Sequence, residues 1–292
     1  MQTKRVVSRL NGGLGNQMFQ YAFGRTLADR MNARFYIEIG KLDSDPLRSY
    51  ALSGFCISAE RMDTGTLRRE VLWPDGLLRR LRWLPTLPGC LSYLAEKSFV
   101  FDPRAAATNH SVCADGYWQS PKYFEGHEII LLREFQLAAP MTAVRQETAA
   151  RIKGVNAVSV HVRRGDYVAN AHTQAFHGLC SPSWYEAAMQ EMALHVDQPY
   201  FFVFSDDTGW SRENIRSEWP MHFIEVQPDG RDFEDMHLIS LCQHHIIANS
   251  SFSWWGAWLN QKPGKRVIAP AKWFNQAAHD TRDLLPSAWQ RL

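Results

Sequence analysis

Residues 4–40 read "KRVVSRLNGGLGNQMFQYAFGRTLADRMNARFYIEIG" and contain a strand, a turn, a helix and a second strand in succession. The apolar run that begins at Val6 predicts a buried strand, and the glycine-rich residues 12–15 predict the turn that ends it. Apolar residues then recur at helical spacing, at Met18, Phe19, Ala22, Phe23 and Leu27. Residues 33–40 predict the second strand. A β-α-β unit of this kind is typical of a doubly wound α/β domain.

The rest of the chain returns to this alternation after an interruption. Residues 41–110 mix arginine, leucine, tryptophan and proline without a clear period, which indicates an insertion or an irregular face. A strand after residue 110 leads to a predicted helix over 122–134, and strands and helices then alternate to about residue 270. We therefore expect two α/β domains, an N-terminal one over 1–150 and a C-terminal one over 151–292.

Composition excludes several classes of protein. Apolar residues make up 45% and charged residues 21% of the 292 positions, which excludes disordered and fibrous chains. The formal net charge of +2 is too small to indicate a nucleic-acid partner. The five cysteines lie far apart without a C-x-x-C pair, which favours reduced thiols. No apolar run reaches the ~20 residues that span a bilayer. We expect a cytoplasmic protein that contacts a membrane at most peripherally.

Polar or glycine-rich clusters follow four of the predicted strands. They are residues 12–17, 161–166, 205–207 and 249–253. In open α/β sheets, ligands bind beyond the carboxyl ends of the strands. Four such clusters together predict a crevice for a polar ligand.

The segment "HVRRGD", residues 161–166, follows an apolar strand directly. Arg163 and Arg164 carry planar, permanently charged groups that suit a diphosphate, and Asp166 is placed to orient one of them. The alternative is a surface ion pair beside a turn, which would stabilise the fold little. We favour the anion site, because two arginines directly after an apolar strand are costly unless an anion compensates them.

Asp206 and Asp207 end the strand "FFVFSDD". A carboxylate there could accept two hydrogen bonds, from N1–H and the 2-amino group of guanine, and so reject other bases. A helix N-cap at Asp207 is an equally weighted alternative. One aspartate could also cap the helix while the other binds the base.

The segment "ANSSFSWWGAWLN", residues 248–260, places Ser250, Ser251 and Ser253 at a predicted helix start. Free N–H groups and the helix dipole favour an anion at such a place. Serine capping is the alternative, and for the three tryptophans of this segment we favour a plain core position.

The sequence offers no good metal site. "DSD", residues 43–45, resembles the D-x-D pair of some glycosyltransferases, but a solvated turn is the better interpretation because no apolar strand precedes it. The glycine turn matches neither Walker A nor a complete G-x-G-x-x-G motif.

Five segments between residues 6 and 270 together resemble the bacterial α-1,2-fucosyltransferases: "GGLGNQMFQYAFG", "GYWQSPKYF", "HVRRGDYV", "FFVFSDD" and "ANSSFSWWGAWL". The resemblance implies a GT-B-type architecture, with two Rossmann-like domains that face each other across a cleft. It implies GDP-fucose as the donor substrate, inversion at the sugar, and no metal or other cofactor. It also implies an acceptor oligosaccharide that contains a β-galactoside, and a lipid-linked acceptor would bring the enzyme to the inner membrane. The N-terminal domain would serve the acceptor and the C-terminal domain GDP-fucose.

The resemblance also implies roles for single residues. Arg163 would hold the β-phosphate, supported by Arg164 and Asp166. His161 and either Asp206 or Asp207 would hold the guanosine part, and Asn249, Ser250 and Ser251 would lie at the donor, the serines on its phosphates. Related protein O-fucosyltransferases carry a similar G-x-x-G-N-Q turn that approaches the donor. The resemblance implies that Gly12, Gly13 and Gly15 admit ligand to the backbone and that Asn16 and Gln17 face it.

The expected mechanism is direct displacement at the anomeric carbon, with positive charge stabilising the departing GDP. Arg163, Asp166 and Asn16 are the catalytic candidates, and the base stays open among Asp166, Asn16 and water. Three rival functions are another GDP-sugar transferase, a non-catalytic nucleotide- or sugar-binding module, and an NAD-dependent oxidoreductase. The last would use Glu38, but the glycine spacing is wrong for it.

The basic residues 68–83 carry arginines among leucines and tryptophans. Such a stretch can lie on an anionic membrane surface. Pro74 and Gly76 interrupt any helix there, so we favour an ordinary arginine-rich surface with buried tryptophans.

Overall fold

The computed structural model describes residues 3–72, 90–165, 178–227, 230–275 and 280–292. The chain divides into two compact units. Unit 1 comprises Met1–Gln136 and Asp280–Leu285, and unit 2 comprises Leu137–His279 and Pro286–Leu292. The division therefore comes before the expected boundary at 150, because the helix over residues 143–153 packs against a later helix of unit 2.

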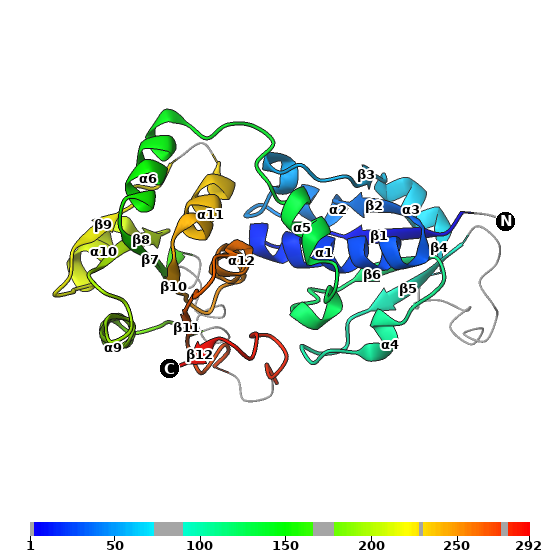
Figure 1. Cartoon of the computed structure of the whole chain (residues 1–292). Coiled ribbons are helices and arrows are strands. Elements are labelled where there is room, and N and C mark those ends of the chain that lie inside the picture. Colours follow the sequence, from blue (N-terminus) through cyan, green and yellow to red (C-terminus); the bar gives the residue numbers. More distant parts are fainter. Residues whose placement is uncertain (1–2, 73–89, 166–177, 228–229, 276–279) are drawn as a thin grey trace. The chain divides into compact units, whose positions relative to one another are not determined.

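Unit 1 is built on a six-stranded parallel sheet in the order β3-β2-β1-β6-β5-β4 (Figure 1). Its strands are β1 Arg5–Arg9, β2 Arg34–Glu38, β3 Glu60–Arg61, β4 Val71–Leu72, β5 Leu91–Ala95 and β6 Val112–Asp115. Its helices are α1 Leu14–Met31, α2 Gly40–Asp43, α3 Thr64–Glu70, α4 Pro103–Ala106 and α5 Glu128–Glu134, with 3-10 turns η1 Leu52–Gly54 and η3 Pro121–Tyr123.

Helix α1 confirms the β-α-β start predicted from residues 4–40. It follows β1 after the glycine turn and lies along the unit 1 sheet (Figure 1). It ends at Asn32, whose φ of 48° is left-handed and whose N–H bonds to the carbonyls of Ala28 and Asp29. Gly24 allows the close packing, since a Cβ there would lie 2.0 Å from Ser8 Oγ and 2.6 Å from Phe35 Cε2.

Two expectations for unit 1 were wrong. Residues 41–110 are not simply an insertion, since they supply β3, β4 and β5 of the sheet, and β3 and β4 are too short to show a period. The helix expected over 122–134 is divided into η3 and α5. Gly126 lies between them with a left-handed φ of 81°, which a continuous helix does not allow.

Unit 2 is a second six-stranded parallel sheet, in the order β12-β11-β10-β7-β8-β9. Its strands are β7 Asn156–Val162, β8 Pro199–Ser205, β9 Met221–Phe223, β10 His244–Ile246, β11 Val267–Ala269 and β12 Gln290–Arg291. Its helices are α6 Ala143–Lys153, α9 Pro182–Ala193, α10 Thr208–Asn214, α11 Asp232–Leu241 and α12 Ser251–Leu259. In chain order the strands run 6-5-4-1-2-3, the Rossmann arrangement, so the expected α/β class is confirmed.

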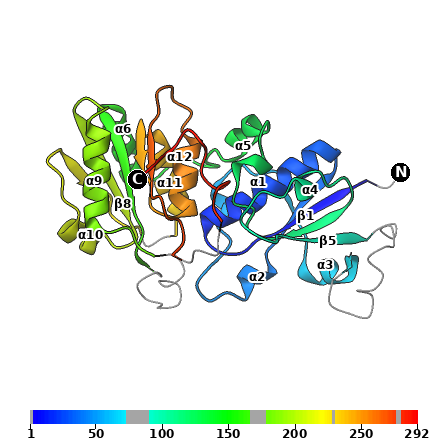
Figure 2. The same ribbon diagram turned by 90° about the horizontal axis from the view of Figure 1, so that it is seen from below.

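Helices cover both faces of the unit 2 sheet. On one face, Val158 and Val160 pack with Tyr185 and Met189 of α9. On the other, Phe202 packs with residues of α6 and α11. Helix α9 accordingly lies on the opposite side of β8 from α11 (Figure 2). Burial on both faces explains why these strands are continuous apolar runs in the sequence.

Within the described ranges, none of the helices is long and apolar enough to cross a bilayer. Of the basic stretch 68–83, residues 73–83 lie outside the described residues. The expectation for that surface stays a prediction.

Candidate functional site

The order of strands in unit 2 reverses between β7 and β10, which are neighbours in the sheet. Such a topological switch point is where α/β sheets bind ligands, beyond the carboxyl ends of the strands. His161 and Arg163 lie at that end of β7, and Asn249 and Ser250 follow β10. The structure thus brings the clusters predicted from the sequence of unit 2 to one edge of one sheet.

His161 is a buried, neutral histidine at this edge. Only 5% of it is exposed, and its ring lies 5.4 Å from that of Phe252. Burial lowers the pKa of His161 to about 4, so the imidazole is uncharged at neutral pH. Its Nδ1 has no hydrogen-bond partner among the residues that the structure describes. A buried polar atom without a partner is costly, and a ligand that hydrogen-bonds to it would remove that cost.

The two arginines after β7 are each held by an aspartate after β8. Arg163 Nη1 lies 2.7 Å from Asp206 Oδ2. Arg164 donates from Nε to Asp207 Oδ2 at 3.3 Å, and its guanidinium lies 3.7 Å from the centre of the Trp210 ring. The ion pair orients the guanidinium of Arg163, and an ion pair together with stacking orients that of Arg164.

Asp206 and Asp207 have different positions. Asp207 is the N-cap of α10, accepting from the backbone N–H of Trp210 at 3.1 Å, so the capping alternative is correct for this residue. Asp206 accepts from the backbone N–H of Arg164 at 2.8 Å and lines a pocket, which Asp207 does not. Of the two, only Asp206 has its side chain at the pocket.

The residues after β10 cap a helix, join two loops and fill the core. Ser250 is the N-cap of α12 and accepts from the N–H of Phe252 at 3.3 Å, and Ser251 begins the helix. Asn249 is buried and donates to the carbonyl of Trp273 at 3.1 Å, which ties two loops together. Trp254, Trp255 and Trp258 are buried, which confirms the core position expected for them.

A pocket lies beside these residues, at the carboxyl ends of β7 and β8 and the start of α11. Its lining includes the expected His161, Arg163 and Asp206. Residues that sequence reasoning missed also line it, among them Arg145, Phe252, Gln227, Arg231, Asp232 and Asp235. Asp235 is ion-paired with Arg145 at 2.6 Å. The acidic first turn of α11, "DFED", was the available signal, but its position in the fold was not readable from the sequence.

The glycine turn of unit 1 is organised by its two amides. Gln17 is fully buried; it donates to the carbonyls of Gly12 and Ser49 and accepts from Ala51 N–H. Gln17 therefore holds the turn, in contrast to the expectation that it faces a ligand. Asn16 is partly exposed and accepts from Gln119 Nε2 at 2.8 Å. Gly15 is buried in the first turn of α1.

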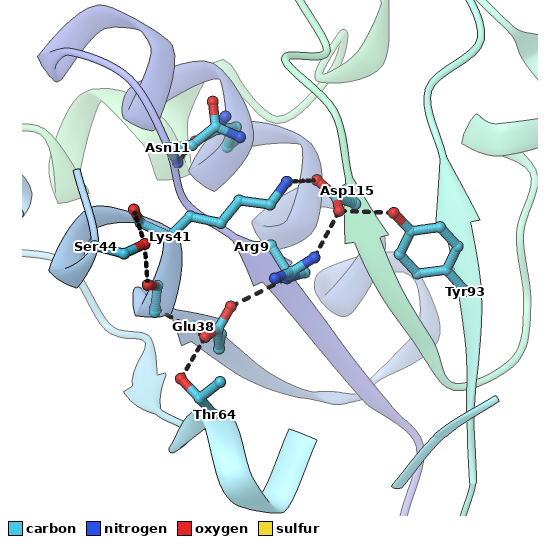
Figure 3. A network of polar contacts seen from close by, with 10 residues as sticks. Arg9, Asn11, Glu38, Lys41, Ser44, Thr64, Tyr93 and Asp115 are labelled. Atoms are coloured by element: carbon cyan, nitrogen blue, oxygen red, sulfur yellow. Dashed lines mark hydrogen bonds and ion pairs between the residues drawn. The ribbon is translucent and has the colours of Figure 1, made fainter. Parts of the chain in front are cut away.

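A network of charged side chains lies at the carboxyl ends of β1, β2 and β6 (Figure 3). Asp115 accepts from Arg9 at 2.7 Å, from Lys41 at 2.6 Å and from Tyr93 at 2.7 Å. Glu38 is fully buried and accepts from Arg9, Gly40 N–H and Thr64. Because the Glu38 carboxylate is fully buried, it is poorly placed to bind a ribose, which weighs against the NAD rival.

Two predicted site features remain, Asp166 and the "DSD" segment. Asp166 lies outside the described residues. In "DSD", Asp43 ends α2 and Asp45 accepts from the N–H of Leu47, as expected of a solvated turn. Among the described residues, no group of three or more His, Cys, Asp or Glu is arranged to hold a metal.

Comparison with known proteins decides the family. The model of glycosyl transferase family 11 matches residues 99–291. The chain belongs to glycosyl transferase family 11. This confirms the resemblance found in the sequence, and the chain is a glycosyltransferase.

Individual relatives agree with this membership. The chain is 35% identical to an alpha-1,2-colitosyltransferase of Escherichia coli over 98% of each chain. It is 30% identical to the O-antigen biosynthesis glycosyltransferase WbnK of Escherichia coli, over 98% of this chain and 100% of that one. It is 34% identical to galactoside alpha-(1,2)-fucosyltransferase 2 of Oryctolagus cuniculus, over 85% of this chain and 65% of that one.

The fold has counterparts among solved structures. The crystal structure of NodZ alpha-1,6-fucosyltransferase soaked with GDP-fucose matches with a TM-score of 0.53 and 13% identity, over 92% of this chain and 96% of that one. At that identity the match concerns the fold alone. It supports the GT-B-type class expected for this family 11 enzyme, with two Rossmann-like units.

Proposed function

We propose that this family 11 enzyme transfers an L-fucosyl group from GDP-fucose to a hydroxyl of a galactoside, in α-1,2 linkage and with inversion. The switch point of unit 2 supports this most directly. A neutral histidine with an unpartnered Nδ1, two oriented arginines and a helix N-terminus gather there beside one pocket. These are groups suited to a base and a diphosphate.

The pocket suits a guanine base. Asp206, Asp232 and Asp235 line it, and an ionised carboxylate accepts the two N–H groups that guanine presents and adenine lacks. Burial keeps His161 uncharged, so its ring can accept or donate one hydrogen bond without adding charge. The pocket's carboxylates would then discriminate the base, and His161 would bind the nucleoside.

The diphosphate would lie at the switch point itself. Arg163 and Arg164 supply positive charge there, and the nine-residue helix α12 directs the positive end of its dipole to the same place. The acceptor hydroxyl oxygen would attack the anomeric carbon as the bond from that carbon to the β-phosphate oxygen breaks, and the hydroxyl proton would pass to water, one of the candidate bases. The electron pair leaves with GDP, whose added charge these groups stabilise. Under this proposal the chain needs no metal.

A second donor deserves the same test, because an alpha-1,2-colitosyltransferase is 35% identical to this chain over 98% of its length. A colitosyl donor that carries GDP would bind to the same nucleotide site as GDP-fucose, and the two donors would differ only in the sugar. A colitosyl donor is therefore a direct alternative to the fucosyl donor.

The test is a transfer assay with GDP-fucose and GDP-colitose on lactose and on methyl β-galactoside, in excess EDTA. We expect GDP-fucose to give an α-1,2-linked product, identified by NMR, at a rate that EDTA does not change. Faster transfer from GDP-colitose would reassign the donor. Loss of activity in EDTA with recovery in manganese would contradict the metal-independent mechanism.

A further inference from the structure

A second pocket lies in unit 1, at the carboxyl ends of β5 and β6, and we name it the β5–β6 pocket. Its volume is about 220 Å³, room for roughly seven waters at ~30 Å³ each, which suits one small ring. The lining residues on which its chemistry depends are Glu96, Ser98, Asp102, Phe101, Trp118 and Tyr123.

Glu96 is held at this pocket by the turn that follows β6. Its Oε2 accepts from the backbone N–H of Tyr117 at 2.6 Å, and its Oε1 accepts from that of Trp118 at 2.9 Å. Gly116 makes this approach possible, because a Cβ there would lie 2.3 Å from the Cβ of Glu96. Each carboxylate oxygen can accept two hydrogen bonds, so Glu96 keeps acceptor capacity for a ligand hydroxyl.

Trp118, which also lines the pocket, has a strained backbone conformation. Its φ is 56°, a left-handed conformation that is unfavourable for a bulky side chain. The hydrogen bond from its N–H to Glu96 and stacking on Phe23, with ring centres 4.1 Å apart, hold Trp118 in that conformation. Strained residues of this kind cluster at ligand sites.

The same turn connects the pocket to the rest of the unit 1 sheet edge. Glu96 N–H donates to the carbonyl of Asp115, the centre of the network in Figure 3. Gln119, one residue beyond Trp118, donates to Asn16 of the glycine turn. The pocket therefore belongs to the carboxyl edge of a parallel sheet, where α/β folds bind ligands.

The lining indicates which class of ligand fits. Among the described residues, two carboxylates, Glu96 and Asp102, line the pocket against a single cation, the exposed Lys97, so the lining is net negative and a phosphate is disfavoured. Carboxylates that accept from hydroxyls, together with aromatic walls against C–H faces, suit an uncharged sugar ring. We propose that the β5–β6 pocket binds one neutral hexopyranose ring of the acceptor glycan and that Glu96 accepts hydrogen bonds from its hydroxyls. This assignment rests on the proposed function, which supplies the galactoside as substrate.

Glu96 also gives the pocket a pH dependence. Burial raises the pKa of Glu96 to about 6, so the carboxyl is ionised at neutral pH and protonated below pH 6. Protonation removes acceptor capacity from the carboxyl. We expect galactoside affinity to fall as the pH drops below 6.

The experiment measures binding of methyl β-galactoside by titration calorimetry to the wild type, Glu96→Gln and Glu128→Gln. Glu128 is a matched control, because it also accepts a backbone N–H, that of Gly126, and lies outside the pocket. We expect Glu96→Gln to weaken galactoside binding at least about tenfold and to lose its pH dependence, with GDP binding within about twofold of the wild type. Glu128→Gln should match the wild type in both.

Ser98→Trp provides a second variant if Glu96→Gln does not fold, since it fills the pocket from an exposed position without removing a carboxylate. A folded Glu96→Gln or Ser98→Trp protein with undiminished galactoside affinity would overturn the proposal, and so would a wild type that binds no galactoside. Hydrolysis of GDP-fucose without acceptor tests the proposed function separately. Galactoside binding that depends on Glu96 would support the pocket even if no fucose were transferred.

Discussion

Arg163 forms its ion pair with Asp206 at 2.7 Å while only 21% of its side chain is exposed. That geometry orients a planar group that can bind two phosphate oxygens at once. A lysine at the same position keeps the charge but loses the second directed hydrogen bond. The shape of the guanidinium, as well as its charge, should therefore matter for leaving-group stabilisation.

We expect Arg163→Lys to lower donor turnover by about 100-fold or more while the protein stays folded. Steady-state kinetics with GDP-fucose and a thermal melt measure the two effects. Arg212→Lys is the control, because Arg212 forms a largely exposed ion pair with Glu225 in the same unit. Near-normal turnover in a folded Arg163→Lys protein would remove Arg163 from the phosphate site.

At the scale of elements, the glycines around α1 differ in what the fold requires of them. A Cβ at Gly24 would overlap Ser8 and Phe35 on the sheet beneath the helix. At Gly13, the N-cap of α1, φ is −75° and a Cβ would meet only Arg48 Nη1, at 3.9 Å. Packing explains Gly24 but not Gly13, and we propose that a ligand approaches the backbone closely at Gly13.

We expect Gly24→Ala to cost about 1–3 kcal/mol of unfolding free energy through overpacking. Gly13→Ala should change stability by less than about 1 kcal/mol and still reduce transfer activity. Urea denaturation and the transfer assay on both variants give the comparison. A stable and fully active Gly13→Ala enzyme would show that no ligand approaches this turn.

The sequence predicts the elements that are long and buried. Strands β7 and β8 have seven residues each and are mostly apolar and buried, and the polar residues at their carboxyl ends include three that line the pocket, His161, Arg163 and Asp206. Strands β3 and β4 have two residues each and leave no period to detect. Asp235 and Arg145 come from helices whose rotation against the sheet depends on tertiary packing, so their place in the pocket could not be read in advance.

For the whole molecule, acid should destabilise unit 2 in particular. Burial is the first cause that lowers the pKa of five of its histidines, at 161, 222, 237, 244 and 245. Such a histidine binds fewer protons folded than unfolded, so stability is retained above pH 6.5 and lost as the pH falls toward the folded pKa. His161, with a pKa of about 4, alone contributes a loss of about 2 kcal/mol at pH 5.

We expect calorimetric melts to show a lower Tm at pH 5 than at pH 7.5, with the loss concentrated between pH 6.5 and 4. His161→Phe keeps an aromatic ring beside Phe252 and removes the titrating group. That variant should lose less stability on acidification than the wild type. A Tm that does not change between pH 7.5 and 5 would contradict the burial of neutral histidines.

The central claim is that unit 2 holds the GDP of the donor at the switch point between β7 and β10 without a metal. The most direct measurement is calorimetric titration of the protein with GDP and with ADP in excess EDTA. We predict that GDP binds at least about tenfold more tightly than ADP, a difference of about 1.4 kcal/mol, because carboxylates in the pocket pair with guanine alone. Equal affinities for the two nucleotides, or GDP binding that requires a divalent metal, would contradict the claim.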